Sequence, residues 1–155
     1  MRTLRPTRRV VLRVGLALVL LFALIQLVPY GRSTHNPPVT RAAQFPDATT
    51  SRLFASACGD CHSNLTKRWW LTRIAPASWL AENDIRGGRE NLNVSAWDRP
   101  QEGVDDVVEA VEGGGMPPLQ YKLFHGDARL SDAQRQQLAA GLRRLYATDP
   151  PAATR

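Results

Sequence analysis

Hydrophobic residues recur at helical spacing along most of the chain, and one nearly continuous apolar run lies near its start. The run covers residues 10–30 and contains a single charged residue, Arg13. At about 1.5 Å per helical residue such a run spans roughly 30 Å, the thickness of the hydrocarbon core of a bilayer. The pattern predicts a single N-terminal transmembrane helix, with residues 1–30 as an uncleaved membrane anchor.

Arginines are unevenly distributed around this run. Residues 1–30 hold five arginines and no acid, and only Arg32 and Arg41 follow closely. By the positive-inside rule, the N-terminus lies in the cytoplasm and the rest of the chain on the far side of a bacterial inner membrane, in the periplasm. The alternative is a cleaved secretory signal, for which residues 14–25 would form the apolar core, although no suitable small-residue cleavage site follows.

The remainder of the chain predicts a mainly α fold. Residues 31–46 are polar and rich in proline, which favours an extended linker. One folded domain is expected over residues 47–148, followed by a disordered tail, 149–155. We expect helices near residues 47–58, 76–88, 101–112 and 131–148. Two have clear local signals: a valine stripe at 104, 107, 108 and 111 in the third, and a capping box of Ser131 and Gln134 in the last.

The net charge of +6 belongs mostly to the N-terminus. Beyond residue 30 there are 15 basic and 14 acidic residues. The part that folds is therefore nearly neutral and carries no basic stripe with interleaved aromatics, so a nucleic-acid partner is not expected.

The chain has two cysteines, and they stand three positions apart in Cys58-Gly59-Asp60-Cys61-His62. A disulfide framework needs distant partners and a structural zinc site needs four ligands, so neither is favoured. Two thiols on one helical turn can each form a thioether to a porphyrin vinyl group, and the adjacent His62 can bind the iron. The string predicts one covalent haem c, so residues 47–148 are expected to form a haem-binding domain. A dithiol redox motif of the same spacing is the alternative.

A second axial ligand is expected from Met116. It follows three glycines, which permit close backbone approach, and precedes Pro117 and Pro118, which stiffen the segment. The alternatives are a core methionine and ligation by His125 instead. Arg73, Arg86 and Arg89 are candidate partners for the haem propionates, of which we select Arg86 and Arg89.

Four tryptophans at 69, 70, 79 and 97 are expected to pack in the core or against the haem.

Several spaced elements resemble those of a small haem-binding-domain family of bacterial cytochromes. They are Cys58-x-x-Cys61-His62-Ser63-Asn64, Ile74-Ala75-Pro76-x-Ser78-Trp79, Asn91-Leu92-Asn93 with Trp97, Met116-Pro117-Pro118 and Ala128-Arg129-Leu130-Ser131. The resemblance covers residues 50 to 145 and implies a single covalent haem in a mostly helical cytochrome-c-like fold, with His62 and Met116 as axial ligands. Residues 67–70 depart from the pattern, since no proline separates the two aromatics.

The sequence thus predicts a membrane-tethered electron carrier with His62 and Met116 on the iron. It would exchange single electrons with a redox partner protein or respiratory complex and would itself transform no substrate. Two alternatives stay open. One is a haem sensor or peroxidase-like enzyme with an open distal site, and the other is an exported thiol-disulfide oxidoreductase.

Overall fold

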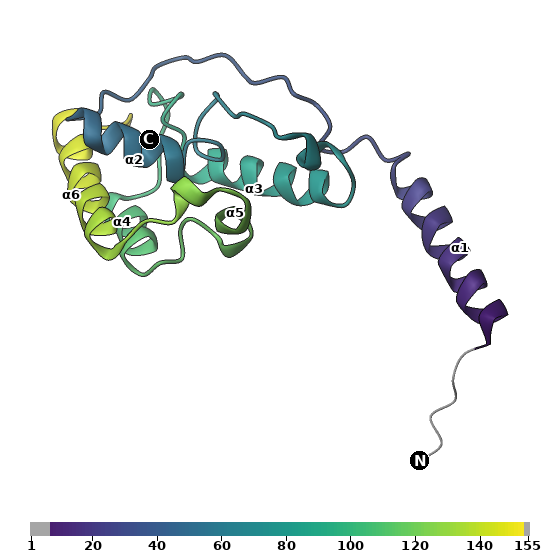
Figure 1. The fold of residues 1–155 in the computed structure, drawn as a ribbon. Helices are drawn as coiled ribbons and strands as arrows, with labels where there is room; N and C mark the ends of the chain where they lie inside the picture. The colour runs from purple at the N-terminus through teal and green to yellow at the C-terminus, as the bar shows by residue number, and fades with distance from the viewer. Residues whose placement is uncertain (1–6, 154–155) are drawn as a thin grey trace. The chain divides into compact units, whose positions relative to one another are not determined.

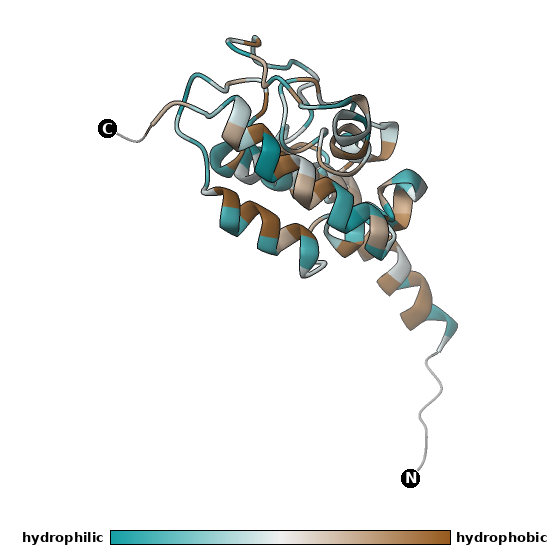
Figure 2. Cartoon of the chain, turned by 90° about the vertical axis from the view of Figure 1, so that its left-hand side faces the viewer, coloured by the Kyte–Doolittle hydropathy of each residue, from teal (hydrophilic) through white to brown (hydrophobic). Residues whose placement is uncertain are grey.

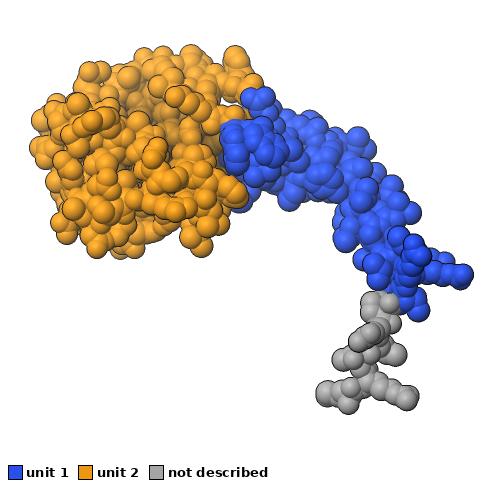
Figure 3. All heavy atoms as spheres, viewed as in Figure 1, with its two compact units in different colours: residues 1–33, 69–83 blue, residues 34–68, 84–155 orange. Residues whose placement is uncertain are grey.

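The computed structural model describes residues 7–153, which divide into two compact units (Figures 1 and 3). Unit 1 combines the chain up to Ser33 with residues 69–83, and unit 2 combines residues 34–68 with the chain from Asp84 onward. The fold is mainly α. The elements in chain order are α1 (Arg8–Ile25), α2 (Ala48–Ala57), a 3-10 helix η1 (Trp70–Arg73), α3 (Ala77–Asn91), α4 (Val104–Glu112), α5 (Leu119–Phe124), a 3-10 helix η2 (Gly126–Ala128) and α6 (Asp132–Thr148).

The prediction of an N-terminal transmembrane helix is wrong. The helix over the apolar run, α1, has 18 residues, and three of them are arginines at 8, 9 and 13. After Arg13 the uncharged part of the helix ends at Ile25 and is only about 18 Å long, at about 1.5 Å per residue, against a bilayer core of about 30 Å. Within residues 7–153 no helix is both long enough and apolar enough to cross a membrane. This finding overturns the predicted anchor and the predicted single-pass location in the inner membrane. Arg2 and Arg5, used for the orientation, lie outside the described residues, as do the last two residues of the predicted tail.

Unit 1 is held together by the turn that follows α1. The carboxamide of Gln26 donates to the carbonyl of Ala75 at 2.9 Å and accepts from the Ala75 N–H at 3.1 Å, as a paired strand would. Gly31 has φ +73°, and a Cβ at this position would lie 2.1 Å from the carbonyl oxygen of Ser78. A side chain at residue 31 is therefore excluded both by conformation and by space.

In unit 2, α2 begins where the sequence predicts. Asp47 caps it by accepting from the backbone N–H of Thr50 at 2.7 Å and from the Thr50 hydroxyl at 2.8 Å. Thr50 is fully buried against α6. The crossing is close, because a Cβ at Gly141 would lie 2.2 Å from the Thr50 oxygen. The glycine is what allows the two helices to approach.

The core of unit 2 lies among α2, α4 and α6. Its fully buried members are Phe54, Trp97, Val108, Leu138, Leu142 and Leu145, among others. The helices of this unit carry hydrophobic residues on one side and hydrophilic residues on the other (Figure 2). The valine stripe is confirmed, with Val107, Val108 and Val111 buried, and so is the capping box of Ser131 and Gln134 at the start of α6.

The helix predicted over residues 101–112 corresponds to α4, which begins at Val104 and not at Gln101. The side chain of Gln101 accepts from the N–H of Asn93 at 2.7 Å and donates to the carbonyl of Ala96 at 2.9 Å. Gln101 is thus bonded to the loop that precedes it and not within a first helical turn.

Candidate functional site

The two cysteines lie on one turn that continues from α2. The amides of Cys61 and His62 both donate to the carbonyl of Cys58, at 3.1 and 2.9 Å. Both thiols are free and half-buried. Residues 58–64 are called the attachment loop below. The loop therefore presents two thiols and an imidazole from one compact turn, as the sequence predicts.

Burial controls the protonation of these side chains. It raises the pKa of Cys58 to about 12, with the nearby Cys61 adding to the effect. Burial also raises the pKa of Cys61 to about 12, with smaller effects from the carboxylates of Asp84 and Asp60. Both groups are protonated thiols at neutral pH, so neither is an activated thiolate.

His62 is held by its inner ring nitrogen. Nδ1 lies 3.0 Å from the carbonyl oxygen of Leu92, and because a carbonyl only accepts, Nδ1 carries the proton. Burial lowers the pKa of His62, which favours the neutral imidazole. A metal-binding histidine usually donates its other ring N–H to a carbonyl or carboxylate. With Nδ1 protonated, Nε2 is the ring nitrogen that keeps a lone pair for a metal.

Helix α3 packs its backbone directly against the attachment loop. A Cβ at Gly88 would stand 2.6 Å from the carbonyl oxygen of Cys61. Leu92, whose carbonyl accepts the hydrogen bond from His62, lies one turn later and donates its own N–H to the carbonyl of Gly88 at 2.9 Å. The glycine thus sets the distance at which α3 supports the loop.

A buried polar network holds the far side of the loop. Asn64 and Asn93 are joined side chain to side chain at 2.9 Å, and the N–H of Asn64 donates to the Ser95 hydroxyl at 3.0 Å. The Asn64 side-chain oxygen is the acceptor in the bond with Asn93, and its side-chain nitrogen donates to the carbonyl of Pro38 at 2.7 Å. The segment 34–46 is extended here and forms one parallel bridge, between Arg41 and Ala96.

The two arginines proposed for propionates lie in different surroundings. Arg89 donates to the carbonyl of Ser63 at 2.9 Å, to Asn36 at 2.8 Å and to Thr66 at 2.9 Å. The side chain of Arg86 is 64% exposed, and its Nε lies 3.8 Å from Glu90. Arg89 therefore ties the attachment loop to the preceding segment, while Arg86 faces solvent.

Met116 lies in residues 113–118, here called the methionine strap. Gly114 has φ +74°, which lets the chain reverse after α4, and the Met116 N–H donates to the carbonyl of Ala110 at 2.9 Å. Met116 itself is 39% exposed. The strap leads directly into α5.

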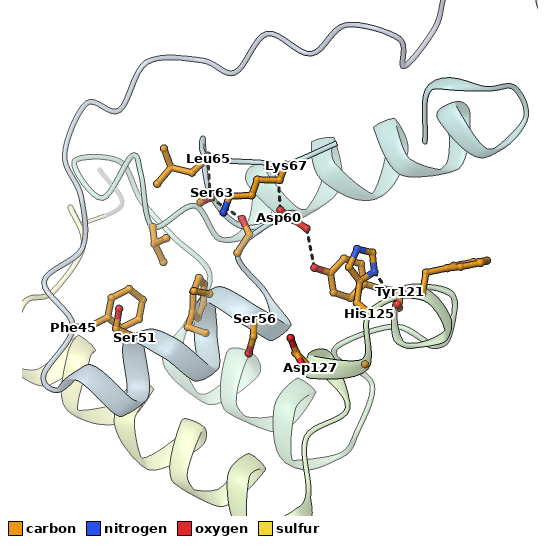
Figure 4. Close-up of a pocket in the computed structure, with 16 residues that line it drawn as sticks. Phe45, Ser51, Ser56, Asp60, Ser63, Leu65, Lys67, Tyr121, His125 and Asp127 are labelled. Carbon is orange, nitrogen blue, oxygen red and sulfur yellow. Dashed lines mark hydrogen bonds between the residues drawn. The ribbon is translucent and has the colours of Figure 1, made fainter. Parts of the chain in front are cut away.

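A pocket of about 640 Å³ opens beside the attachment loop, within the size range of small-molecule sites. Its lining includes Gly59, Asp60 and Ser63 of the loop, Phe54 of α2, and Tyr121 and His125. Figure 4 labels Asp60, Ser63, Tyr121 and His125. The ring of His125 stacks on that of Tyr121 at 3.8 Å, and its Nδ1–H donates to the Tyr121 carbonyl at 3.0 Å. Nothing in the sequence pattern pointed to Tyr121, because α5 is short and its partner is distant.

The tryptophans divide into core and surface residues. Trp97 is fully buried, and its indole N–H donates to the carbonyl of Asp149 at 2.6 Å. Trp69 and Trp70 are exposed at 43% and 59%. Core packing is thus confirmed for Trp97 but not for Trp69 and Trp70, whose packing against a haem stays a prediction.

The described residues contain no group of three histidine, cysteine or acidic side chains that could hold a bare metal ion. Among the comparisons with known proteins, one family matches: the haem-binding domain, over residues 20–144. Searches of curated proteins and of solved structures returned no match.

Proposed function

The chain belongs to the haem-binding domain family, and we propose that it carries one covalently bound haem and exchanges single electrons with a redox partner protein. His62 carries this proposal, since its Nδ1–H is fixed on the Leu92 carbonyl and its pKa is lowered. The arrangement is that of a metal-binding imidazole with its outer partner in place.

Cys58 and Cys61 are proposed to attach the haem. Each thiol would add across one vinyl group, its sulfur to one carbon and its hydrogen to the other, with no atom lost. The haem would supply an iron that cycles between ferrous and ferric states. Unit 2 fits such a group: the thiols and the imidazole come from one turn, and three segments hold that turn in place.

Met116 is proposed as the second axial ligand. A thioether favours ferrous iron and raises the reduction potential relative to a second histidine. Met116 is 39% exposed, and this exposure favours the alternative in which its thioether does not bind the iron. If the thioether does not reach the iron, the distal site stays open and the protein is a sensor or a peroxidase-like enzyme.

The dithiol alternative is less well supported. A disulfide exchange enzyme needs an accessible thiolate of lowered pKa. Here burial raises the pKa of both thiols.

Of the propionate candidates, Arg86 is the better proposal, because its guanidinium is exposed, whereas Arg89 already donates to three protein groups.

Covalent attachment is tested by acid-acetone extraction of the purified holoprotein, followed by the pyridine haemochrome spectrum. The haem should stay with the wild-type chain. In Cys58→Ala/Cys61→Ala the haem should be extracted, and the haemochrome maximum should shift to that of haem with free vinyl groups. Extraction of haem from the wild-type chain would refute the attachment.

Ligation is tested separately in the ferric protein. A thioether on ferric haem gives a weak near-infrared band, which should be present in the wild type, absent in Met116→Ala and retained in His125→Ala. A band that is missing in the wild type would refute ligation by Met116 and favour the open site or ligation by His125.

A further inference from the structure

The methionine strap is fixed at both of its ends. At the start, the Met116 N–H bonds to the carbonyl of Ala110 at the end of α4. At the other end, Pro118 precedes α5, whose own position is set by two side chains. Gln120 donates to Asp84 of α3 at 3.3 Å, and Tyr121 donates to Asp60 at 2.8 Å. Met116 is therefore held by its own amide and by the anchored helix that follows the strap.

The bond from Tyr121 reaches the attachment loop itself. Asp60 stands between the two cysteines, and one of its carboxylate oxygens accepts from the Tyr121 hydroxyl (Figure 4). The other oxygen accepts from the N–H of Lys67 at 3.0 Å, and the Asp60 carbonyl accepts from Thr66 at 2.5 Å. Asp60 is thus a rigid acceptor, so its bond to Tyr121 fixes α5 as well.

The tyrosine is well suited to this role. Its ring stacks on His125 with an interplanar angle of 8°, which restricts its rotation. Burial raises the pKa of Tyr121, as do the charge and the hydrogen bond of Asp60. The hydroxyl therefore stays protonated at neutral pH and remains a donor. A hydrogen bond to a carboxylate is stronger than one between neutral groups.

We propose that Tyr121 is a positioning residue for Met116, the proposed second axial ligand of the iron. By tying α5 to Asp60 it keeps the methionine strap closed, and the strength of this bond determines how easily an outside ligand replaces Met116. The proposal rests on the proposed ligation by Met116. Its ligand class is small molecules that coordinate iron directly, and imidazole is the probe.

The test is an imidazole titration of the ferric, haem-loaded full chain, followed by the thioether band. Tyr121→Phe should bind imidazole about tenfold more tightly than the wild type, the size expected for loss of one hydrogen bond to a charged group. The reduction potential of this variant should also fall once the strap opens. Tyr146→Phe is the matched control, since its hydroxyl donates to the Glu102 carbonyl at 2.8 Å in another part of unit 2. Its imidazole affinity should equal that of the wild type.

A second variant examines the same bond from its other end. Asp60→Ala removes the acceptor and should raise imidazole affinity about as much as Tyr121→Phe, and the double variant should gain nothing further. Haem content and helical circular dichroism verify that each variant is folded. Equal imidazole affinities in the wild type, Tyr121→Phe and Asp60→Ala, with the thioether band present, would overturn the role of Tyr121 alone. A wild-type chain without that band would overturn both this proposal and ligation by Met116.

Discussion

The carbonyl oxygen of Cys61 faces Gly88 so closely that a Cβ at residue 88 would stand 2.6 Å from it. The contact is backbone to backbone, because the nearest atom is a main-chain oxygen. It cannot be relieved by rotating a side chain. Either α3 or the attachment loop would have to move.

Gly88→Ala should therefore lower stability by about 2 kcal/mol, the usual cost of overpacking a fixed site, and reduce haem incorporation. Gly87→Ala is the neighbouring control in the same helix. A Cβ there meets nothing within 4 Å, so this variant should gain about 1 kcal/mol from the better helix propensity of alanine. Urea denaturation of both variants measures the difference. Similar stabilities for the two would contradict the packing.

Asp47 should make the stability of unit 2 depend on acid pH. Hydrogen bonds from the Thr50 backbone and side chain, then from Arg144, lower the pKa of Asp47 from 3.8 to about 2. Because the folded pKa is lowered, the stabilisation is complete above pH 3.8 and is lost as the pH falls through about 2.

Asp47→Asn should be less stable than the wild type at neutral pH, and the gap should close as the pH falls through that window. Thermal denaturation across the pH range measures it. Asp105→Asn is the control, since Asp105 stands in the first turn of α4, where the cap makes no side-chain hydrogen bond. A gap for Asp47→Asn that is constant with pH would contradict the assignment.

Arg89 and Arg86 should differ in their effect on stability. Arg89→Ala removes three hydrogen bonds to the attachment loop and its neighbours and should cost about 2–3 kcal/mol, since the partners are partly buried. Arg86→Ala removes only an exposed pair with Glu90 and should change stability by less than about 0.5 kcal/mol. Chemical denaturation of the apo chain separates them without any contribution from haem.

Trp97 and Trp70 provide a similar contrast. Trp97 donates to the Asp149 carbonyl and packs edge-on against Tyr146, with ring centroids 5.2 Å apart. Trp97→Phe should lower the free energy of unfolding by about 2 kcal/mol. Trp70→Phe, at an exposed position, should change it by less than about 0.5 kcal/mol. A larger effect at Trp70 would mean that its exposed ring is covered in solution.

The sequence predicted those features that depend on neighbouring residues. The helix starts at Asp47 and Ser131 were correct because an N-cap bonds to the backbone three residues later. The turn bearing both cysteines followed from its short spacing. Family membership, inferred from motifs spread along the chain, is confirmed.

Features that depend on distant partners were missed. Gln101 looked like the start of a helix, yet its amide bonds to a loop eight residues away in sequence. Arg89 was selected as a partner for a haem propionate, and the sequence did not reveal its three protein acceptors, which lie 23 or more residues away. The apolar run failed as a membrane span because Arg13 lies within the helix and the helix ends at Ile25. Hydropathy alone does not reveal where a helix stops.

The extended segment ahead of α2, residues 34–46, limits how far the N-terminal side of this domain can be truncated. Thr40 and Ala43 donate to the carbonyls of Ser95 and Val94, at 3.0 and 2.8 Å, and Pro38 accepts from Asn64. A chain shortened to begin at residue 47 would keep every helix from α2 onward but would strip these partners from buried amides and carbonyls. We expect the smallest autonomous haem domain to begin near residue 34, so residues 34–46 are its first structural element and not a spacer.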